Sequence, residues 1–532
     1  MSEETEPELK FTSTIIAFQV AVDILKLADD DVRKAAEAIS QERFAMAANE
    51  FYTDKDRAKG LGTIVVNPKL LGKVFNATDP LTTLPVERSL EFWRHVDYGI
   101  FDEPFFEKQN ISRLRLLGFK SRLPSLEETS DVSVFLTLNK YGVAVISFWY
   151  HITAPLSPDQ LAHLQLLPML ETPSITASLP IDLLEAAGKY NSKAGSIAKK
   201  AKEAGKSEVT FGQKNPLTFQ SLTWFYWGPI LNAIHGGRFT SQEQMMKELR
   251  SEAFICFPFI IAQELEPAYD QASEYYENMP KQIYQVVNQC LDYPADVVRI
   301  KAVKKQLGQN LSDREDVLYL STLGSALIAF GTQTTVVSQN VVASELNAIR
   351  GRFTPQEGED PVALEIARIA LEAYDVTEIV LMQRLLLDIV EVFFSNKDII
   401  DMKPQEMVRM HESLANQLEM VYGSKSFRET SALIRFQRAK KVMLVDEIAE
   451  RLKSKLDNIE NAQKSLHDLK SEIQQGVLGV ILGAVPSILI FIGASNPTLT
   501  SILSVAISAL GMLIANQFAY FYWKLIRRRE KI

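Results

Sequence analysis

The chain has 532 residues and a formal net charge of −9, with 46% hydrophobic and 23% charged residues. This length and composition allow one large or two ordinary cores, and the negative charge argues against a general nucleic-acid-binding protein. The two cysteines, Cys256 and Cys290, form no Cys-x-x-Cys motif. Cys256 lies in an apolar run and is interpreted as a buried small hydrophobe in a reducing cytosol.

The first 250 residues are predicted to form an N-terminal α/β region. We expect helices over the first sixty residues, including the apolar stretch 15–25, and strands at 63–66 and 113–117. Segments 132–138 and 143–150 are rich in β-branched and aromatic residues and flank a turn that contains Asn139 and Gly142, which predicts a β-hairpin. The lysine-rich segment 193–206 is interpreted as a solvated helix or linker, with an anion- or nucleotide-binding surface as the alternative.

Residues 251–352 are predicted to form a second α/β part of the same cytoplasmic domain. It contains a buried strand at 254–261 and a second hairpin from 317–320 and 326–330, and it ends in a loop at 351–358. The following region, 353–475, is predicted to be helical, with helices at about 361–395 and 405–421.

A heptad pattern predicts one long helix over about 426–475. Apolar residues recur every seven positions at Val445, Leu452, Ile459, Leu466 and Ile473. This pattern is typical of a coiled coil. We interpret the helix as a self-associating stalk, with packing on its own chain as the alternative.

Two uncharged apolar segments, 477–492 and 499–523, predict a transmembrane hairpin over 476–532. At 1.5 Å per residue, about 18 residues cover roughly 27 Å, close to the thickness of a bilayer core. Aromatic residues and a Lys/Arg cluster follow the second segment, around Trp523 and Arg527–Arg529. They predict a multi-pass protein of the cell (inner) membrane, in contact with lipid, with both termini on the cytoplasmic side.

Small residues on the first apolar segment indicate a candidate pore lining. They are Gly476, Gly479, Gly483 and Ser487. Residues of this kind permit close helix packing. They also leave a narrow axial passage if several copies surround an axis, so that a pore requires a homo-oligomer. Packing alone is the other interpretation.

The α/β domain, long stalk, paired C-terminal apolar segments and basic tail resemble the CorA family of divalent-cation channels. Pro486 and the following Ser-Ile-Leu-Ile-Phe-Ile-Gly-Ala-Ser-Asn are similar to the family's first membrane helix, although the Gly-Met-Asn motif is absent. The resemblance implies a homopentamer that passes Mg²⁺ or another divalent cation. It also implies a pore mouth that is formed by Gly493, Ala494, Ser495 and Asn496, with Asn496 matching the motif asparagine.

Three functions are weighed on this basis. The first is a divalent-cation channel that is gated from its cytoplasmic domain. The second is a CorA-like membrane effector of a type III CRISPR or similar antiviral system, which a nucleotide-derived second messenger would gate. The third is a non-conducting, membrane-anchored oligomeric scaffold.

Enzymatic motifs are absent from the sequence. It contains no Walker A motif and no His-Glu-x-x-His, and its six histidines are scattered. We therefore predict no catalytic residue and no enzyme activity, assign no metal ligand, ligand-binding residue or resident cofactor, and expect no direct nucleic-acid partner.

Overall fold

The computed structural model describes a defined part of the chain. The described residues are 8–25, 27, 31–50, 64–66, 90, 93, 96–97, 100, 111–169, 175–212, 215–251, 254–267, 272–288, 317–320, 326–329, 361–396, 427, 430–455, 457, 461, 472 and 475. The chain divides into two compact units, of which the first contains Met1–Asn396 and Glu412–Ala449 and the second contains Lys397–His411 and Glu450–Ile532. The fold described below belongs to the first unit.

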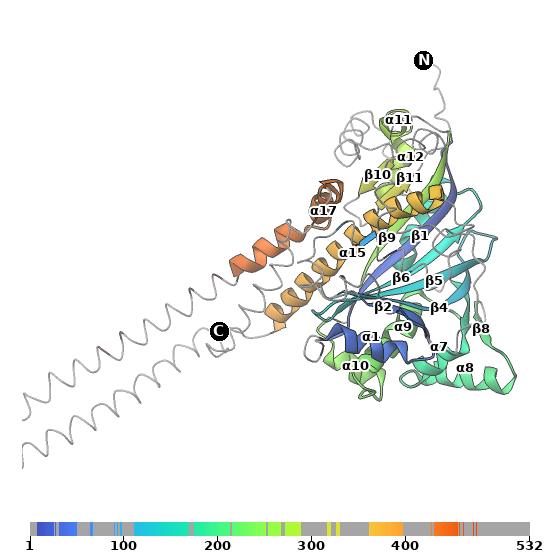
Figure 1. Ribbon diagram of the computed structural model, residues 1–532, viewed down its shortest axis with the longest axis vertical. Helices are drawn as coiled ribbons and strands as arrows, with labels where there is room; N and C mark the ends of the chain where they lie inside the picture. The colour runs from blue at the N-terminus through green and yellow to red at the C-terminus, as the bar shows by residue number, and fades with distance from the viewer. Residues whose placement is uncertain are drawn as a thin grey trace, which may run out of the picture. The chain divides into compact units, whose positions relative to one another are not determined.

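One sheet of 11 described strands organises this unit (Figure 1). Its strands run in the order β10-β11-β9-β1-β6-β5-β4-β2-β3, and β7 pairs with both β4 and β8. The strands are β1 (Lys10–Asp23), β2 (Ala45–Glu50), β3 (Ile64–Val66), β4 (Ser112–Arg122), β5 (Ser130–Leu138), β6 (Val143–Ile152), β7 (Thr176–Pro180), β8 (Glu208–Phe211), β9 (Ile255–Glu266), β10 (Val317–Leu320) and β11 (Ala326–Ala329). The β11–β9 pair is parallel and the other pairs are antiparallel.

The described helices cover both faces of this sheet. They are α1 (Val32–Ser40), α6 (Pro158–Leu166), α7 (Ile181–Gly188), α8 (Ser192–Glu203), α9 (Phe219–Ile234), α10 (Gln242–Glu248), α11 (Ala272–Asn278), α12 (Pro280–Asn288), α15 (Pro361–Asn396) and α17 (Thr430–Val442), with a short 3₁₀ turn at Leu167–Met169. Figure 1 shows α15 along one face of the sheet and α1 and α9 on the other.

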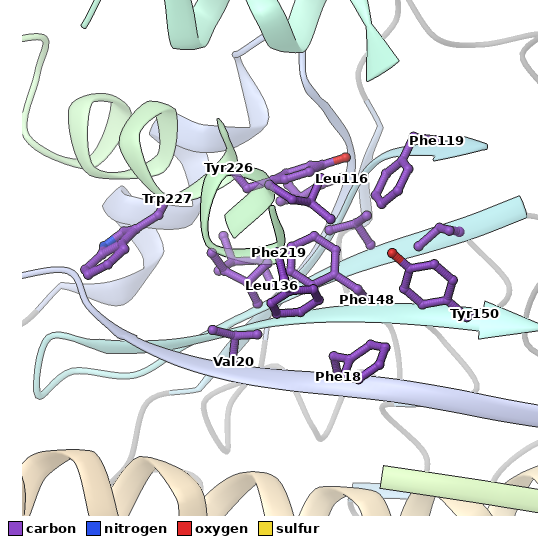
Figure 2. Close-up of a cluster of buried hydrophobic side chains, with 14 of the residues drawn as sticks. Phe18, Val20, Leu116, Phe119, Leu136, Phe148, Tyr150, Phe219, Tyr226 and Trp227 are labelled. Atoms are coloured by element: carbon purple, nitrogen blue, oxygen red, sulfur yellow. The ribbon is translucent and has the colours of Figure 1, made fainter. Parts of the chain in front are cut away.

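The apolar core lies between the sheet and α9. Figure 2 shows Phe18 and Val20 of β1 and Phe148 and Tyr150 of β6 facing the α9 residue Phe219. Alternate residues of a strand point to opposite faces, so Gln19, which adjoins Phe18, and Ser147, which adjoins Phe148, belong to the face that α15 covers. That second face combines these buried polar side chains with apolar ones such as Trp149 and Phe259, which pack against Tyr374 of α15.

Helix α15 is enclosed along its middle part. The residues from Ala370 to Met382 are all buried, whereas a surface helix would keep one exposed polar face. Its buried positions include polar and charged side chains, which must find partners inside the protein. The α15 face of the sheet is therefore the candidate location of a functional site.

The structure confirms most of the predicted strands. The strands at 63–66 and 113–117 correspond to β3 and β4, the first hairpin to β5–β6, the strand at 254–261 to β9, and the second hairpin to β10–β11. In the β5–β6 turn, Gly142 has φ +76°, and an added Cβ would lie 2.0 Å from the Leu25 carbonyl oxygen. The helix predicted at 361–395 is α15, and the helix predicted at 405–421 lies outside the described residues.

The prediction of helices over the first sixty residues is confirmed for α1, but it is wrong for β2 and for residues 10–23. These residues form β1, which pairs with β6 on one side and β9 on the other. A strand that is covered on both faces carries a nearly continuous apolar sequence. Periodicity therefore could not distinguish Ile15 and Ile16 in such a strand from a buried helix.

The predicted continuous helix over 426–475 is interrupted where the structure describes it. Helix α17 ends at Val442, and Met443 and Leu444 form a turn before helical residues resume at Val445. Leu444 has φ +55°, a left-handed conformation that stops an α-helix. Val445 of the heptad pattern and Ile448, one helical turn later, are buried within the single chain, as expected of packing on its own chain.

The predicted fold class, with two C-terminal transmembrane helices, needs correction. The structure shows a mixed α/β, sheet-rich fold, and none of the helices that it describes is both long enough and apolar enough to cross a membrane. The longest described helix, α15, carries charged residues along its length, including Asp375, Glu378 and Arg384. The membrane-protein and ion-channel interpretation and the inner-membrane localisation are therefore not supported, and residues 476–532 lie outside the described residues.

Candidate functional site

The candidate site is a buried charge network between β4 and α15, with Arg113 at its centre. Arg113 alternates on β4 with Leu114, whose side chain belongs to the apolar core, so the arginine points to the α15 face. Its side chain is 3% exposed. A guanidinium group that is buried this deeply needs partners for all five of its N–H groups.

All five N–H groups of Arg113 have acceptors. Nε and Nη2 donate to the two oxygens of Asp97, each at 3.2 Å. Nη2 also donates to Asp375 Oδ1 at 2.8 Å, and Nη1 donates to Glu378 Oε2 at 2.6 Å. The remaining N–H of Nη1 donates to Thr137 Oγ1 on β5 at 2.9 Å. The Arg113 side chain therefore links β4 and β5 to α15 and to the helical residues around Asp97 by hydrogen bonds.

The network places three carboxyl groups around one cation, the Arg113 guanidinium. Asp97, Asp375 and Glu378 have side-chain exposures of 1%, 0% and 1%. If all three were ionised, one positive and three negative charges would leave a net charge of −2 (1 − 3 = −2). Because a buried unbalanced charge is costly, the network favours the uptake of protons.

Two neutral side chains also donate to the α15 carboxyl groups. Trp93 Nε1 donates to Asp375 Oδ1 at 2.7 Å, and Thr137 Oγ1 donates to Glu378 Oε1 at 2.8 Å. The Arg113 guanidinium also lies 4.4 Å from the centre of the Trp93 ring, within the range of a cation–π interaction. These donors fix the rotamers of both carboxyl groups.

The electrostatics follow from this geometry. Burial raises the pKa of Asp97 and Glu378 above the ordinary carboxyl values, although the charge of Arg113 opposes the rise. Burial raises the pKa of Asp375 furthest, and the charges of Asp97 and Glu378 add to the effect. Burial acts to lower the pKa of Arg113, but the charges of the three carboxyl groups outweigh it, so this pKa lies well above its usual value.

A second buried ion pair joins α15 to α17. Arg435 Nη1 of α17 donates to Glu372 Oε1 of α15 at 2.7 Å, and the two side chains are 5% and 0% exposed. In the following turn, the Met443 carbonyl accepts a hydrogen bond from Arg384 Nη1 of α15 at 2.9 Å. Helix α15 therefore presents acids at positions 372, 375 and 378, spaced three residues apart, to arginines of two different elements.

Neutral polar contacts hold α15 to the centre of the sheet. Gln19 Nε2 of β1 donates to the Tyr374 carbonyl at 3.1 Å, and Thr377 Oγ1 donates to Gln19 Oε1 at 3.2 Å. The Tyr374 hydroxyl forms a short hydrogen bond with Ser147 of β6. The position of α15 is thus fixed by directional bonds to four strands, β1, β4, β5 and β6.

The network is suited to charge coupling and proton binding. Among the described residues, no group of His, Cys, Asp or Glu side chains could hold a metal ion. In the network itself, donors from Arg113, Trp93 and Thr137 already occupy five of the six carboxylate oxygens.

The structure does not reach the predicted pore residues. The predicted pore lining and mouth residues lie outside the described residues, namely Gly476, Gly479, Gly483, Ser487, Gly493, Ala494, Ser495 and Asn496. The lysine-rich segment 193–206 contains α8, and its lysines are exposed, which confirms a solvated helix; the anion-binding alternative stays a prediction. Lys202 Nζ lies 2.6 Å from Glu185 Oε1 of α7.

Sequence reasoning missed the charge network, although two signals were present. Arg113 and Arg115 alternate with leucines in a segment that was predicted to be a strand. Glu372, Asp375 and Glu378 recur every third residue in an otherwise apolar part of a predicted helix. Acids at that spacing share one side of a helix, and in an apolar environment they require buried partners.

Comparison with protein-family models, curated proteins and solved structures finds no significant match. Function is therefore inferred from the chemistry of the site itself.

Proposed function

We propose that this chain is a non-enzymatic regulatory protein in which α15 transmits a change of state from the β-sheet to α17. The observation that carries the proposal is the row of buried acids on α15. Asp375 and Glu378 bind Arg113 of the sheet, and Glu372 binds Arg435 of α17. One helix therefore forms buried charged contacts with both elements.

The physical cost of this arrangement supports the proposal. Replacing a buried ion pair by apolar residues of similar volume is often neutral or stabilising. A contribution to the stability of the fold therefore does not by itself account for the network. Charged contacts are directional, however, so a shift of Arg113 changes the preferred position of α15, and a shift of α15 changes the geometry at Arg435.

The burial of α15 also supports the proposed coupling between the sheet and α17. The apolar residues Val376, Ile379 and Val380 of the same helix are also buried, and packed interiors have low compressibility. A displaced α15 would move as a rigid element with two or more discrete positions. A ligand that favours one of these positions would shift their populations by its difference in affinity.

The earlier hypotheses change accordingly. Because the transmembrane hairpin is not supported, neither ion conduction nor a membrane-effector role is proposed. A homo-oligomer and a small anionic or nucleotide ligand remain predictions.

A double-mutant cycle between Arg113→Lys and Arg435→Lys tests the coupling. Lysine keeps the charge but lacks the planar fork of arginine, and the two arginines bind different carboxyl groups of α15. Sites that act independently add within about 0.3–0.5 kcal/mol. We expect an interaction free energy above this range, measured by urea unfolding of the full chain.

The matched control pairs Arg435→Lys with Arg238→Lys. Arg238 forms an exposed ion pair with Glu248 of α10, and its side chain is 49% exposed, so this cycle should be additive. If the Arg113 cycle is also additive, α15 does not couple the sheet to α17, and the proposed function is wrong.

A further inference from the structure

One carboxylate oxygen in the charge network has no donor. Both oxygens of Asp97 accept from Arg113, and both oxygens of Glu378 accept, one from Arg113 and the other from Thr137. Asp375 Oδ1 accepts from Trp93 Nε1 and Arg113 Nη2. Asp375 Oδ2 is buried and accepts no hydrogen bond.

A proton on Asp375 Oδ2 would compensate for the missing hydrogen-bond donor. A buried carboxylate oxygen without a donor carries the full desolvation penalty, whereas a protonated oxygen becomes a donor. Arg113 Nη2 donates to both Asp97 Oδ1 and Asp375 Oδ1, so the two carboxyl groups are neighbours, and a hydrogen bond from Asp375 acts to lower the pKa of Asp97. Two ionised carboxylates have no proton to share, so such a bond requires one of the pair to be neutral.

We infer that Asp375 is a neutral acid at neutral pH, with its proton on Oδ2 and donated to Asp97, and that this proton latches α15 to the sheet. With the proton bound, the four ionisable groups of the network carry one positive and two negative charges (1 − 2 = −1). Loss of the proton would create a pair of adjacent buried anions on opposite sides of the interface. A rise in pH should then loosen the contact between α15 and the sheet.

The groups that face Asp375 from each packed element favour this assignment. From the helical residues before β4 come the Asp97 carboxyl and the Trp93 indole, and from β4 comes the Arg113 guanidinium. Within α15 itself, Glu378 and the Tyr374 phenol lie nearby, and the charge of Glu378 adds to the rise in the Asp375 pKa that burial causes. Arg113 is the one cation among these groups, and its five donors are already engaged.

Asp375→Asn is the sharpest probe because it copies the neutral acid. The Asn oxygen can accept from Arg113 and Trp93, and its amide group can donate to Asp97 where the proton would lie. Asp97→Asn is the matched variant. Both Asp97 oxygens accept from Arg113, so one amide N–H₂ group would face the guanidinium. The two substitutions have the same chemistry but opposite expected effects on stability.

The first measurement is the unfolding equilibrium constant of each full-length protein as a function of pH. A group whose pKa is raised on folding stabilises the fold fully below its unfolded pKa, and that stability is lost as the pH rises towards the folded pKa. One proton that is held only by the folded state changes the constant about tenfold per pH unit. The ratio of the wild-type constant to that of Asp375→Asn should therefore rise roughly 100-fold from about pH 5 to about pH 7. A ratio that is independent of pH would overturn the assignment.

The second measurement is infrared spectroscopy of the wild type at neutral pH, which needs no variant to fold. It should show the C=O stretch of a buried, protonated carboxyl group, and this band should disappear in Asp375→Asn and persist in Asp97→Asn. The absence of the band in the wild type, or its loss in Asp97→Asn alone, would refute the inference. The consequence for α17 rests on the proposed function, but both measurements detect the proton without reference to α17, so each idea can fail separately.

Discussion

Removal of the central cation by Arg113→Met should destabilise the protein strongly, and more strongly at high pH. The substitution leaves Asp97, Asp375 and Glu378 buried without a cation and removes five hydrogen-bond donors. Breaking a buried ion pair by removing one partner costs about 3–5 kcal/mol. We expect a loss in this range near neutral pH, measured by urea unfolding of the full chain.

The pH dependence distinguishes lost charge balance from lost packing. In the variant, the pKa of each carboxyl group in the folded state rises further because Arg113 no longer opposes the effect of burial. Stability is then fully present below the unfolded carboxyl pKa and falls as the pH rises. As the pH is lowered, the loss of unfolding free energy relative to the wild type should therefore shrink. The change should be about 1.4 kcal/mol per pH unit for each extra proton that the folded variant binds.

Two controls sharpen this experiment. Arg238→Met removes an arginine whose ion pair with Glu248 is exposed, and it should change stability by at most about 1 kcal/mol. Adding Asp375→Asn and Glu378→Gln to Arg113→Met should restore much of the lost stability, because fewer unpaired acids remain. A loss below about 1 kcal/mol, or a loss that is equal at low and high pH, would refute the charge-balance reasoning.

Two further predictions concern the backbone. Gly118→Ala should cost about 2 kcal/mol, since an added Cβ would lie 2.2 Å from the Val132 carbonyl oxygen at the β4–β5 irregularity; Gly212→Ala, with its nearest contact at 3.6 Å, should be well tolerated in the same unfolding assay. At Leu444, where φ is +55°, Leu444→Gly should be tolerated, whereas the β-branched Leu444→Val should lose about 1 kcal/mol. Equal costs within either pair of substitutions would contradict the assigned geometry.

The parts of the fold that the sequence predicted are those with local causes. The β5–β6 hairpin has Gly142 at a position of positive φ, and β9 and α15 carry apolar runs of the lengths typical of a strand and a long helix. By contrast, β1 was interpreted as helical because both of its faces are buried in the middle of the sheet. Its pairing with β9 joins residues as far apart as Phe18 and Pro258, and no local pattern encodes that contact.

The charge network was not predictable in full for the same reason. Arg113 and Asp375 are separated by 262 positions in the chain, and Arg113 and Glu378 by 265. The acid spacing on α15 shows that buried partners are needed, but it cannot select which arginine supplies them. The break at Leu444 was also hidden, since leucine is a good helix former and positive φ is imposed by the surrounding structure.

The most direct test of the proposed coupling is amide hydrogen exchange in α17 after the substitution Arg113→Lys. Exchange reports the free energy of local opening, and Arg113 lies in β4 while its carboxyl partners Asp375 and Glu378 lie in α15. The amides of α17 should exchange faster in the variant, while those of α8 keep their wild-type rates as an internal reference. Unchanged exchange in α17 with faster exchange confined to β4 would show that α15 transmits nothing from the sheet.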